Sequence, residues 1–296
     1  MSSRPPQGER ESLGRRLLRS TEGVFEIFTV YLGVKLGLYQ ALAGGDAMTP
    51  EELARATGTQ PRPVEEWLDA QAVWHIVERS EESGVRRYRL PADHVEVLVD
   101  EDSLDYLGGW VRLIVGVTRP MEDLLLAFRE GGGVALESYG DDLREGQAET
   151  NRAAFLQLLG DEWLPAITDV HDRLNAQKTA RVADIGCGAG WSSIAIARAY
   201  PSVIVDGFDR DEESIALARR NAEAADLSDR IHFHVEDVTR MEVRQSYDLV
   251  IALESVHDTA SPAATLRTMR ELAGDDGDVI VVEEKIFDIK EARDEE

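Results

Sequence analysis

The sequence has almost no cysteine. Cys187 is the single one among 296 residues, which excludes a disulfide within the chain and a zinc site built from several cysteines. Lysine is also scarce, with four residues (Lys35, Lys178, Lys285 and Lys290) against many arginines. The formal net charge is −25 at pH 7. Such an acidic chain is poorly suited to bind nucleic acid or an anionic membrane surface, so we expect neither partner.

Long uninterrupted hydrophobic runs are missing as well. The apolar stretch 24–42 contains Glu26 and Lys35 and reads as an amphipathic helix. The pair Arg15-Arg16 before it faintly suggests a twin-arginine signal, but no clean apolar core follows. We therefore expect a cytoplasmic protein.

Glycine is concentrated in one arrangement, in the stretch 181–190 that reads Arg-Val-Ala-Asp-Ile-Gly-Cys-Gly-Ala-Gly. A short apolar run followed by a glycine-rich turn and a helical pattern from Trp191 is typical of a ligand-binding strand, turn and helix. A dinucleotide fingerprint requires its third glycine three residues after the second, where Trp191 stands. Asp184 within the strand would repel a pyrophosphate and suits a cationic ligand.

The pattern Asp184-x-Gly186-x-Gly188-x-Gly190 resembles motif I of the class I S-adenosylmethionine (SAM) methyltransferases. From residue 181 on, strands alternate with helices, which is typical of a parallel sheet. The resemblance implies an α/β fold with a Rossmann-like sheet and SAM as cofactor. The strands are expected at 181–185, 203–208, 231–235, 247–253 and 279–284.

Acidic residues that follow two of these strands are candidates for holding the nucleoside of SAM. Asp209 comes nineteen residues after Gly190, where a carboxylate can accept from both ribose hydroxyls; the alternative role is a cap for a helix at 212–225. The resemblance implies that Asp237 takes the adenine amino group and that the backbone of Val238 meets a ring nitrogen. The predicted cofactor site comprises Asp184, Gly186, Cys187, Gly188, Gly190, Asp209, Arg210, Glu236, Asp237, Val238 and Glu254.

His257-Asp258 follows the fourth strand, at the edge where ligands bind in open α/β sheets. It resembles the His-Asp pair of many O-methyltransferases, in which the histidine deprotonates the accepting hydroxyl. A histidine whose pKa is near neutrality suits that task; the alternative is a loop histidine that caps the helix starting near Pro262. The resemblance also implies a later acid that steadies the base, for which Glu283 or Glu284 is placed, and we predict no metal site.

The first hundred residues predict a winged-helix-like domain at 21–100, after a disordered leader at 1–20. Helices are expected at 22–42, from Thr49-Pro50 on, and at 62–72, followed by a hairpin of strands 76–79 and 87–90 around Ser83-Gly84. The patterns at 36–42, 49–54 and 67–68 resemble the N-terminal domain of small-molecule O-methyltransferases. That domain dimerises and helps to wall the substrate pocket.

Acidic side chains crowd the part of this domain that would face DNA, including Glu65, Glu66 and Asp69. They would repel phosphate, which disfavours a role in DNA binding.

A helical linker that contributes to the pocket is expected at 101–178, with a loop at 138–142, before a methyltransferase domain at 179–296. Twelve residues follow Glu284, too few for the antiparallel strand pair and the helix that end the sheet of class I methyltransferases. We therefore expect a sheet that lacks its last two strands, because the sequence is a fragment or because the fifth strand is a blunted or covered edge.

Together these patterns predict a SAM-dependent methyltransferase that acts on the hydroxyl of a small molecule, with His257, Asp258 and Glu283 as catalytic residues and a homodimer as the assembly. Three alternatives stay open. They are a SAM-binding regulator without activity, an inactive truncated paralogue, and a methyltransferase acting on nitrogen or carbon, for which His257 would be dispensable.

Overall fold

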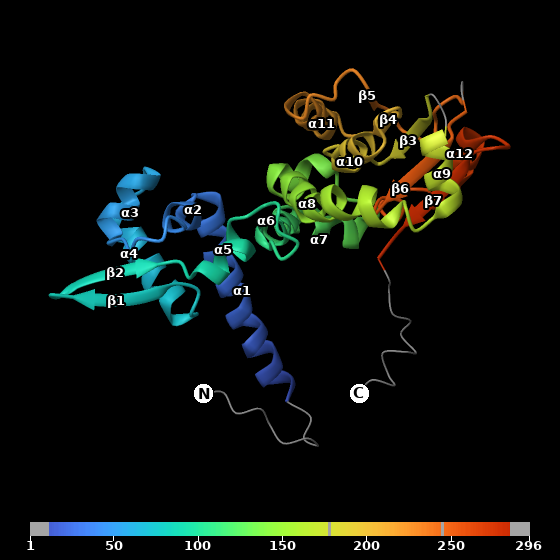
Figure 1. The fold of residues 1–296 in the computed structure, drawn as a ribbon. Coiled ribbons are helices and arrows are strands. Elements are labelled where there is room, and N and C mark those ends of the chain that lie inside the picture. Colours follow the sequence, from blue (N-terminus) through green and yellow to red (C-terminus); the bar gives the residue numbers. More distant parts are fainter. Residues whose placement is uncertain (1–11, 177–178, 244–245, 285–296) are drawn as a thin grey trace. The chain divides into compact units, whose positions relative to one another are not determined.

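The chain forms two compact units, Met1–Thr150 and Asn151–Glu296. The computed structural model describes residues 12–176, 179–243 and 246–284 (Figure 1). Within these ranges, every helix is too short or too polar to cross a membrane. The boundary between the units falls inside the predicted helical linker 101–178, which is therefore divided between them.

The first helix begins earlier than predicted. Helix α1 (Leu13–Lys35) starts after Ser12, whose hydroxyl accepts from the N–H of Arg15 and so caps the helix. The predicted disordered leader is wrong for residues 13–20, whereas residues 1–11 lie outside the described residues. The predicted helix 22–42 is two helices, because Gly37 adopts a left-handed φ of 68° and separates α1 from α2 (Leu38–Leu42).

The next elements form the predicted winged helix. Helix α3 (Pro50–Thr57) opens with a capping box between Thr49 and Glu52, and α4 (Pro61–Val73) follows. Strands β1 (Glu78–Glu82) and β2 (Val85–Arg89) form an antiparallel hairpin. The two residues between them, Ser83 and Gly84, both have positive φ, as a tight hairpin turn requires.

The core of this domain is built around the aromatic pair of Tyr39 and Trp67, whose rings meet edge to face at 5.2 Å. Their polar atoms are satisfied inside the core, since Trp67 donates to the carbonyl of Thr29 and Tyr39 donates to the buried side chain of Gln71. Gly33 lies against both rings, and a Cβ there would come within 2.3 Å of Tyr39. Helices α1 and α4 can therefore approach closely only with glycine at position 33.

Helices continue to the end of the first unit. They are α5 (Ala92–Leu98), α6 (Gly108–Val117), α7 (Met121–Glu130), the 3₁₀ turn η1 (Leu136–Tyr139) and α8 (Gly140–Ala154), which runs into the second unit. The predicted loop at 138–142 is wrong, because α8 already begins at Gly140 with Asp141 and Asp142 in its first turn, where acidic residues stabilise a helix.

The second unit is a parallel sheet between helices. Its elements are the π-helix η2 (Phe155–Trp163), α9 (Thr168–Ala176), β3 (Arg181–Ile185), α10 (Trp191–Ala199), β4 (Ile204–Asp209), α11 (Glu212–Ala224), β5 (Ile231–Val235), β6 (Leu249–Leu253), α12 (Pro262–Ala273) and β7 (Asp278–Val282). The strand order is β5-β4-β3-β6-β7, and all pairs are parallel. All five predicted strands are present, within two residues of the predicted bounds.

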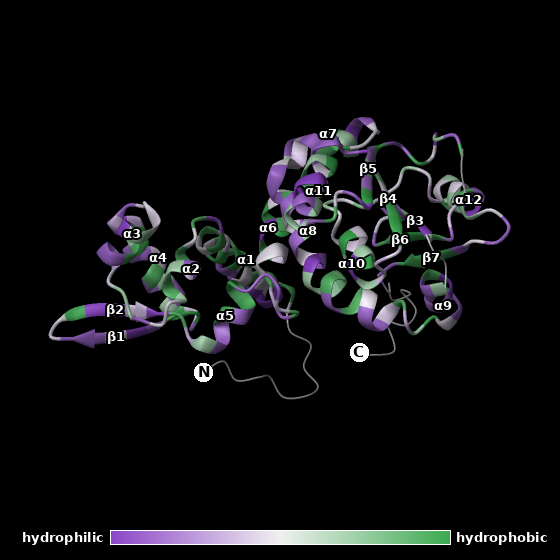
Figure 2. Ribbon diagram, turned by 45° about the horizontal axis from the view of Figure 1, so that its top comes forward, coloured by the Kyte–Doolittle hydropathy of each residue, from purple (hydrophilic) through white to green (hydrophobic). Residues whose placement is uncertain are grey.

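Alternate residues of the strands supply two separate cores. Val182, Val205 and Ile251 pack with η2, α9, α10 and α11 on one face of the sheet. Ala183 and Val250 pack with α12 on the other face. Figure 2 shows that strands β4, β6 and β7 are largely hydrophobic, whereas the helices around them carry both hydrophilic and hydrophobic residues.

Among the described residues, β7 is an edge strand that pairs with β6 on one side. Because β4 and β6 lie on opposite sides of β3, the strand order reverses at β3, and open α/β sheets bind ligands at that point, beyond the carboxyl ends of the strands.

Candidate functional site

The glycine turn after β3 packs directly against the loop after β6. Gly186 has a φ of 69°, and a Cβ on it would lie 2.5 Å from the Cβ of Ser255. The hydroxyl of Ser255 donates to the carbonyl of Ile185 at 2.9 Å. Position 186 therefore requires glycine twice over, for its conformation and for this close approach. The contact joins the two loops at the point where the strand order reverses.

Asp184 lies beneath this turn and is 1% exposed. One of its oxygens accepts from the hydroxyls of both Ser192 and Ser193 at 2.6 Å, which ties the first turn of α10 to β3. Burial raises the pKa of this carboxyl, and the two serine hydroxyls partly offset that effect. The sequence pattern does not predict a role for either serine, although two adjacent hydroxyls in the first turn of the helix are a signal that the sequence carries.

Asp209 ends β4 with its carboxylate turned to the glycine turn. One oxygen accepts from the N–H of Gly188 and the other from the N–H of Asp211, both at 2.9 Å. Burial raises the pKa of Asp209, and these two backbone donors partly offset it. The alternative role of Asp209 as a helix cap is wrong, because Asp211 caps α11 by accepting from Ser214. Each oxygen of Asp209 keeps capacity for a further donor.

The predicted adenine residues follow β5, next to Asp209. The N–H of Glu236 donates to the carbonyl of Asp209 at 2.8 Å, which holds the ends of β4 and β5 together. The carboxylate of Asp237 accepts from the hydroxyl and the N–H of Thr239, and these bonds lower its pKa. Val238 is buried. The positive charge of the exposed Arg210 contributes to the lowered pKa of Asp237. The same charge opposes the larger effect of burial, which raises the pKa of Asp209.

Cys187 is buried within the glycine turn. Its sulfur would lie 3.0 Å from a Cβ built on Gly207, and burial raises the pKa of the thiol well above its ordinary value. A thiol kept protonated in this way is a poor nucleophile.

His257 lies in the loop after β6 and is bonded to the residue that follows β7. Its Nδ1 is hydrogen-bonded to Oε2 of Glu283, while Oε1 of Glu283 accepts from the N–H of Val256 at 2.8 Å. The bond to Glu283 raises the pKa of His257. Burial alone would raise the pKa of Glu283, but the bonds from His257 and Val256 outweigh it and lower that pKa. Of the two acids placed near this histidine by the sequence, Glu283 makes the hydrogen bond to it.

The other nitrogen of the His257 ring, Nε2, lies 3.5 Å from Oδ1 of the exposed Asp258. The alternative in which His257 caps the following helix is wrong, since Ser261 is the N-cap residue of α12 and no side chain makes a cap bond there. His257 is half exposed, so a small molecule can reach Nε2.

Glu254 follows β6 in a left-handed conformation, with a φ of 51°. Its Oε2 accepts from the N–H of Glu284 at 3.1 Å. Burial raises the pKa of Glu254, and the charges of Glu283 and Glu284 add to this effect. One ligand atom from each of Glu254, His257 and Glu283 lies within 4.8 Å of the other two, a spacing that could hold a metal ion. All three groups also hydrogen-bond within the protein.

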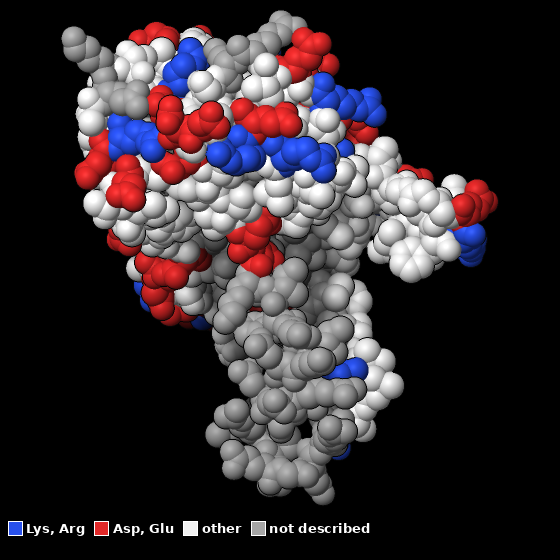
Figure 3. Space-filling view, turned by 90° about the vertical axis from the view of Figure 1, so that its right-hand side faces the viewer, with Lys and Arg blue, Asp and Glu red and all other residues white. Residues whose placement is uncertain are grey.

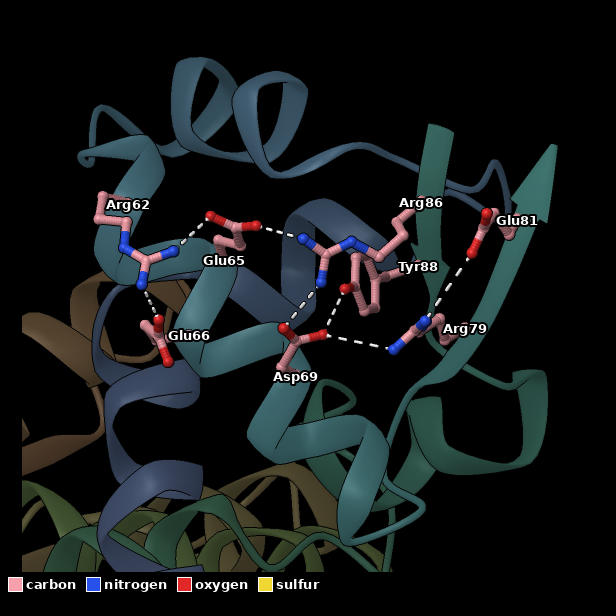
Figure 4. A network of polar contacts seen from close by, with 8 residues as sticks. All are labelled: Arg62, Glu65, Glu66, Asp69, Arg79, Glu81, Arg86 and Tyr88. Carbon is pink, nitrogen blue, oxygen red and sulfur yellow. Dashed lines mark hydrogen bonds and ion pairs between the residues drawn. The ribbon is translucent and has the colours of Figure 1, made fainter. Parts of the chain in front are cut away.

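The winged helix carries its own network of polar contacts, drawn in Figure 4. Arg86 of β2 binds Glu65 and Asp69 of α4, and the hydroxyl of Tyr88 donates to Asp69 at 2.6 Å. Arg62 at the start of α4 is bonded to Glu65 as well. Arg62 and Arg86 are thus bonded to acidic side chains of α4.

Comparisons with known proteins agree with this architecture. Residues 176–295 match the model of a family described as a methyltransferase domain, and residues 27–100 match an Rv2258c-like winged helix-turn-helix domain. The chain carries a SAM-dependent methyltransferase domain.

The curated relatives match this domain only in part. A tRNA1(Val) (adenine(37)-N6)-methyltransferase of Yersinia enterocolitica is 33% identical over 79 residues, which is 26% of this chain and 32% of the relative. The corresponding protein of Yersinia pestis is 34% identical over 98 residues, or 32% of this chain and 35% of the relative. The matched stretch thus spans about a third of these relatives.

Solved structures share the fold over most of the chain. The mitomycin 7-O-methyltransferase structure has a TM-score of 0.69 at 18% identity and covers 93% of this chain and 81% of its own. Human N-acetylserotonin methyltransferase in complex with SAM has a TM-score of 0.67 at 19% identity, with coverage of 93% and 81%. An O-methyltransferase family protein from Burkholderia thailandensis has a TM-score of 0.65 at 17% identity, with coverage of 92% and 80%.

The hydrogen-bonding groups and the open space of the methyltransferase domain fit SAM. Asp209 offers carboxylate oxygens with spare capacity beside the glycine turn. A Cβ on Gly188 would meet no atom within 4 Å, so the turn leaves open space beside its backbone. On the face drawn in Figure 3, the basic side chains lie among acidic ones and form no broad positive area on the described residues.

Proposed function

We propose that this chain transfers the methyl group of SAM to a hydroxyl oxygen of a small molecule, with His257 as the general base. The observation that carries the proposal is the bond between His257 and Glu283, in the loop that also packs on the glycine turn. A carboxylate can only accept, so Nδ1 carries the proton of the neutral ring, and Nε2, which lies 3.5 Å from Oδ1 of Asp258, holds the lone pair that can take another.

The cofactor is held in this proposal by the carboxyl ends of β3, β4 and β5. Asp209 accepts from the ribose hydroxyls, Asp237 and the backbone of Val238 meet the adenine, and the turn from Gly186 to Gly190 lies along the rest of the molecule. Asp184 acts from below by fixing the turn through Ser192 and Ser193. Bound SAM supplies an electrophilic methyl group on a positively charged sulfur.

The reaction is an in-line displacement. Nε2 of His257 would take the proton of the acceptor hydroxyl, and the oxygen would attack the methyl group that bound SAM would supply, with the demethylated cofactor as the leaving group. The positive charge gained by His257 is balanced by Glu283. Such proton transfer contributes about 10²- to 10⁴-fold to a rate.

Substitution of the base tests this assignment. We expect His257→Ala to lower kcat/KM for hydroxyl acceptors by about 10²- to 10⁴-fold and to leave the affinity for SAM, measured by calorimetry, unchanged. His232→Ala is the matched control, because His232 is an exposed histidine of β5. Release of the demethylated cofactor with a panel of small phenols and alcohols is the readout.

The alternatives correspond to other outcomes of the same experiment. Full activity of His257→Ala would favour methylation of nitrogen or carbon, as in the N6-adenine methyltransferases among the relatives. SAM binding without turnover on any acceptor would favour a SAM-binding regulator or an inactive paralogue. The cytoplasmic location stays a prediction from the sequence.

We further propose that the first unit forms a homodimer. Helix α1 exposes a series of large apolar side chains, and α6 exposes three more, a concentration that is typical of an interface. They are Leu13, Leu17, Leu18, Val24, Phe25, Phe28 and Leu32 of α1 and Trp110, Ile114 and Val117 of α6. We expect a dimer by light scattering and a monomer for Phe25→Glu/Leu32→Glu, whereas Val73→Glu on the exposed end of α4 should leave the dimer intact.

A further inference from the structure

The side chain of Glu254 replaces a backbone acceptor where β6 and β7 end. The last residue pair of these parallel strands is Leu253 with Val282, and the N–H of Glu254 continues the ladder by donating to the carbonyl of Val282 at 2.8 Å. In a regular parallel ladder, the carbonyl of residue 254 would next accept from the N–H of residue 284. In this protein, Oε2 of Glu254 accepts from that N–H at 3.1 Å.

The cause is the backbone of Glu254. Its φ of 51° lies in the left-handed region, which residues other than glycine seldom adopt. This conformation takes the chain out of the sheet and towards the glycine turn, where Ser255 donates to Ile185. The side-chain carboxylate of Glu254 accepts the hydrogen bond beside β7 that its backbone carbonyl would accept in a regular ladder.

The hydrogen bonds of Glu254 lead to Glu283, which is the partner of the proposed base His257. Glu254 is hydrogen-bonded to the residues on both sides of Glu283. Glu283 in turn accepts hydrogen bonds from Val256 and His257. We propose that Glu254 is a positioning residue, which fixes the carboxylate of Glu283 and thereby orients the imidazole of His257. This proposal rests on the proposed function in so far as His257 is the base, and it gives Glu254 a role other than contact with the cofactor.

A second effect of Glu254 must be separated from positioning. Its negative charge faces His257 together with those of Glu283 and Asp258, so any substitution that removes the charge also changes the environment of the ring. Glu254→Gln removes the charge but keeps an oxygen that can accept from the N–H of Glu284. Glu254→Ala removes both, and Glu254→Gly removes both while suiting the left-handed backbone.

The three variants therefore isolate the hydrogen bond. We expect Glu254→Gln to lose less kcat than Glu254→Ala and Glu254→Gly, because it retains an acceptor for the N–H of Glu284. We expect Glu254→Ala and Glu254→Gly to lose about 10- to 100-fold in kcat, because misplaced catalytic groups cost rates of that order, with KM for SAM unchanged. Glu284→Ala is the control, since it removes a neighbouring charge and keeps the N–H.

Nuclear magnetic resonance of the full chain gives a readout that does not need activity. The pKa of the His257 imidazole should be lower in Glu254→Gly than in Glu254→Gln, because only the former releases Glu283. Equal pKa values in these two variants, equal loss of activity in them, or full activity of Glu254→Gly would each overturn the proposal. If His257→Ala were fully active, the base assignment would fail, yet the comparison of pKa values would still test the role of Glu254.

Discussion

His257 and Glu283 are hydrogen-bonded although 26 positions separate them in the chain. The bond joins the loop after β6 to the residue that follows β7, so the pairing of these two strands brings the two groups together. A carboxylate in this place fixes the tautomer of the ring and stabilises its protonated form.

This relationship predicts how activity depends on pH. The hydrogen bond that His257 donates to Glu283 is the main cause that raises the pKa of His257 above 6.5, and only the neutral ring can take a proton. We therefore expect kcat/KM to rise with pH and to level off above a midpoint that exceeds 6.5. In Glu283→Gln the charge is gone, so the midpoint of the pH–rate profile should move to lower pH while the plateau falls. A profile identical to that of wild type would contradict the pairing; Glu271→Gln, an exposed residue of α12, is the control.

The cofactor site makes a second prediction. Asp209→Asn exchanges an accepting oxygen for a donor that faces N–H groups, so it should weaken SAM binding by about 1–3 kcal/mol, which calorimetric titration can measure. The exposed Glu212→Gln, three residues further along, should bind as wild type does. Unchanged affinity of Asp209→Asn would remove Asp209 from the ribose site.

The methyltransferase domain could be read from the sequence because its signals are local. The strand, glycine turn and helix at 181–199 are adjacent in the chain, and each residue of the turn carries its conformational requirement with it. The capping box of α3 and the hairpin at Ser83-Gly84 were predictable for the same reason.

The features that could not be predicted from the sequence depend on strand register or on residues that suit two different structures. The contacts of Glu254 with β7 require the pairing of Leu253 with Val282, which no local pattern specifies. The break at Gly37 was missed because the apolar spacing of Leu36 and Leu38 continues that of a helix. The glycine and acidic residues at 140–142 are typical of a loop, but they also suit the first turn of a helix, which is what they form.

A third prediction concerns the winged helix. Because Arg86 is bonded to Glu65 and Asp69, we expect the chain not to bind duplex DNA at physiological salt in an electrophoretic mobility-shift experiment. Glu65→Gln/Asp69→Asn frees the arginine, and any DNA binding that it gains should be weak and lost as salt rises. Specific binding of a duplex by the wild-type chain would contradict this prediction and favour the regulator.

The last prediction tests the contact that joins the two halves of the site. In Gly186→Ala, the new Cβ would lie 2.5 Å from the Cβ of Ser255, and alanine would have to adopt a φ of 69°. We expect a loss of about 1–3 kcal/mol in the free energy of unfolding from the backbone strain alone, with more from the clash. Ser255→Gly removes the clashing atom but also the hydroxyl that donates to Ile185. In the double variant Gly186→Ala/Ser255→Gly the destabilisation should therefore be smaller than the sum of the two single effects. Thermal unfolding of the four proteins measures this coupling, and strictly additive effects would mean that the two loops do not touch at this position.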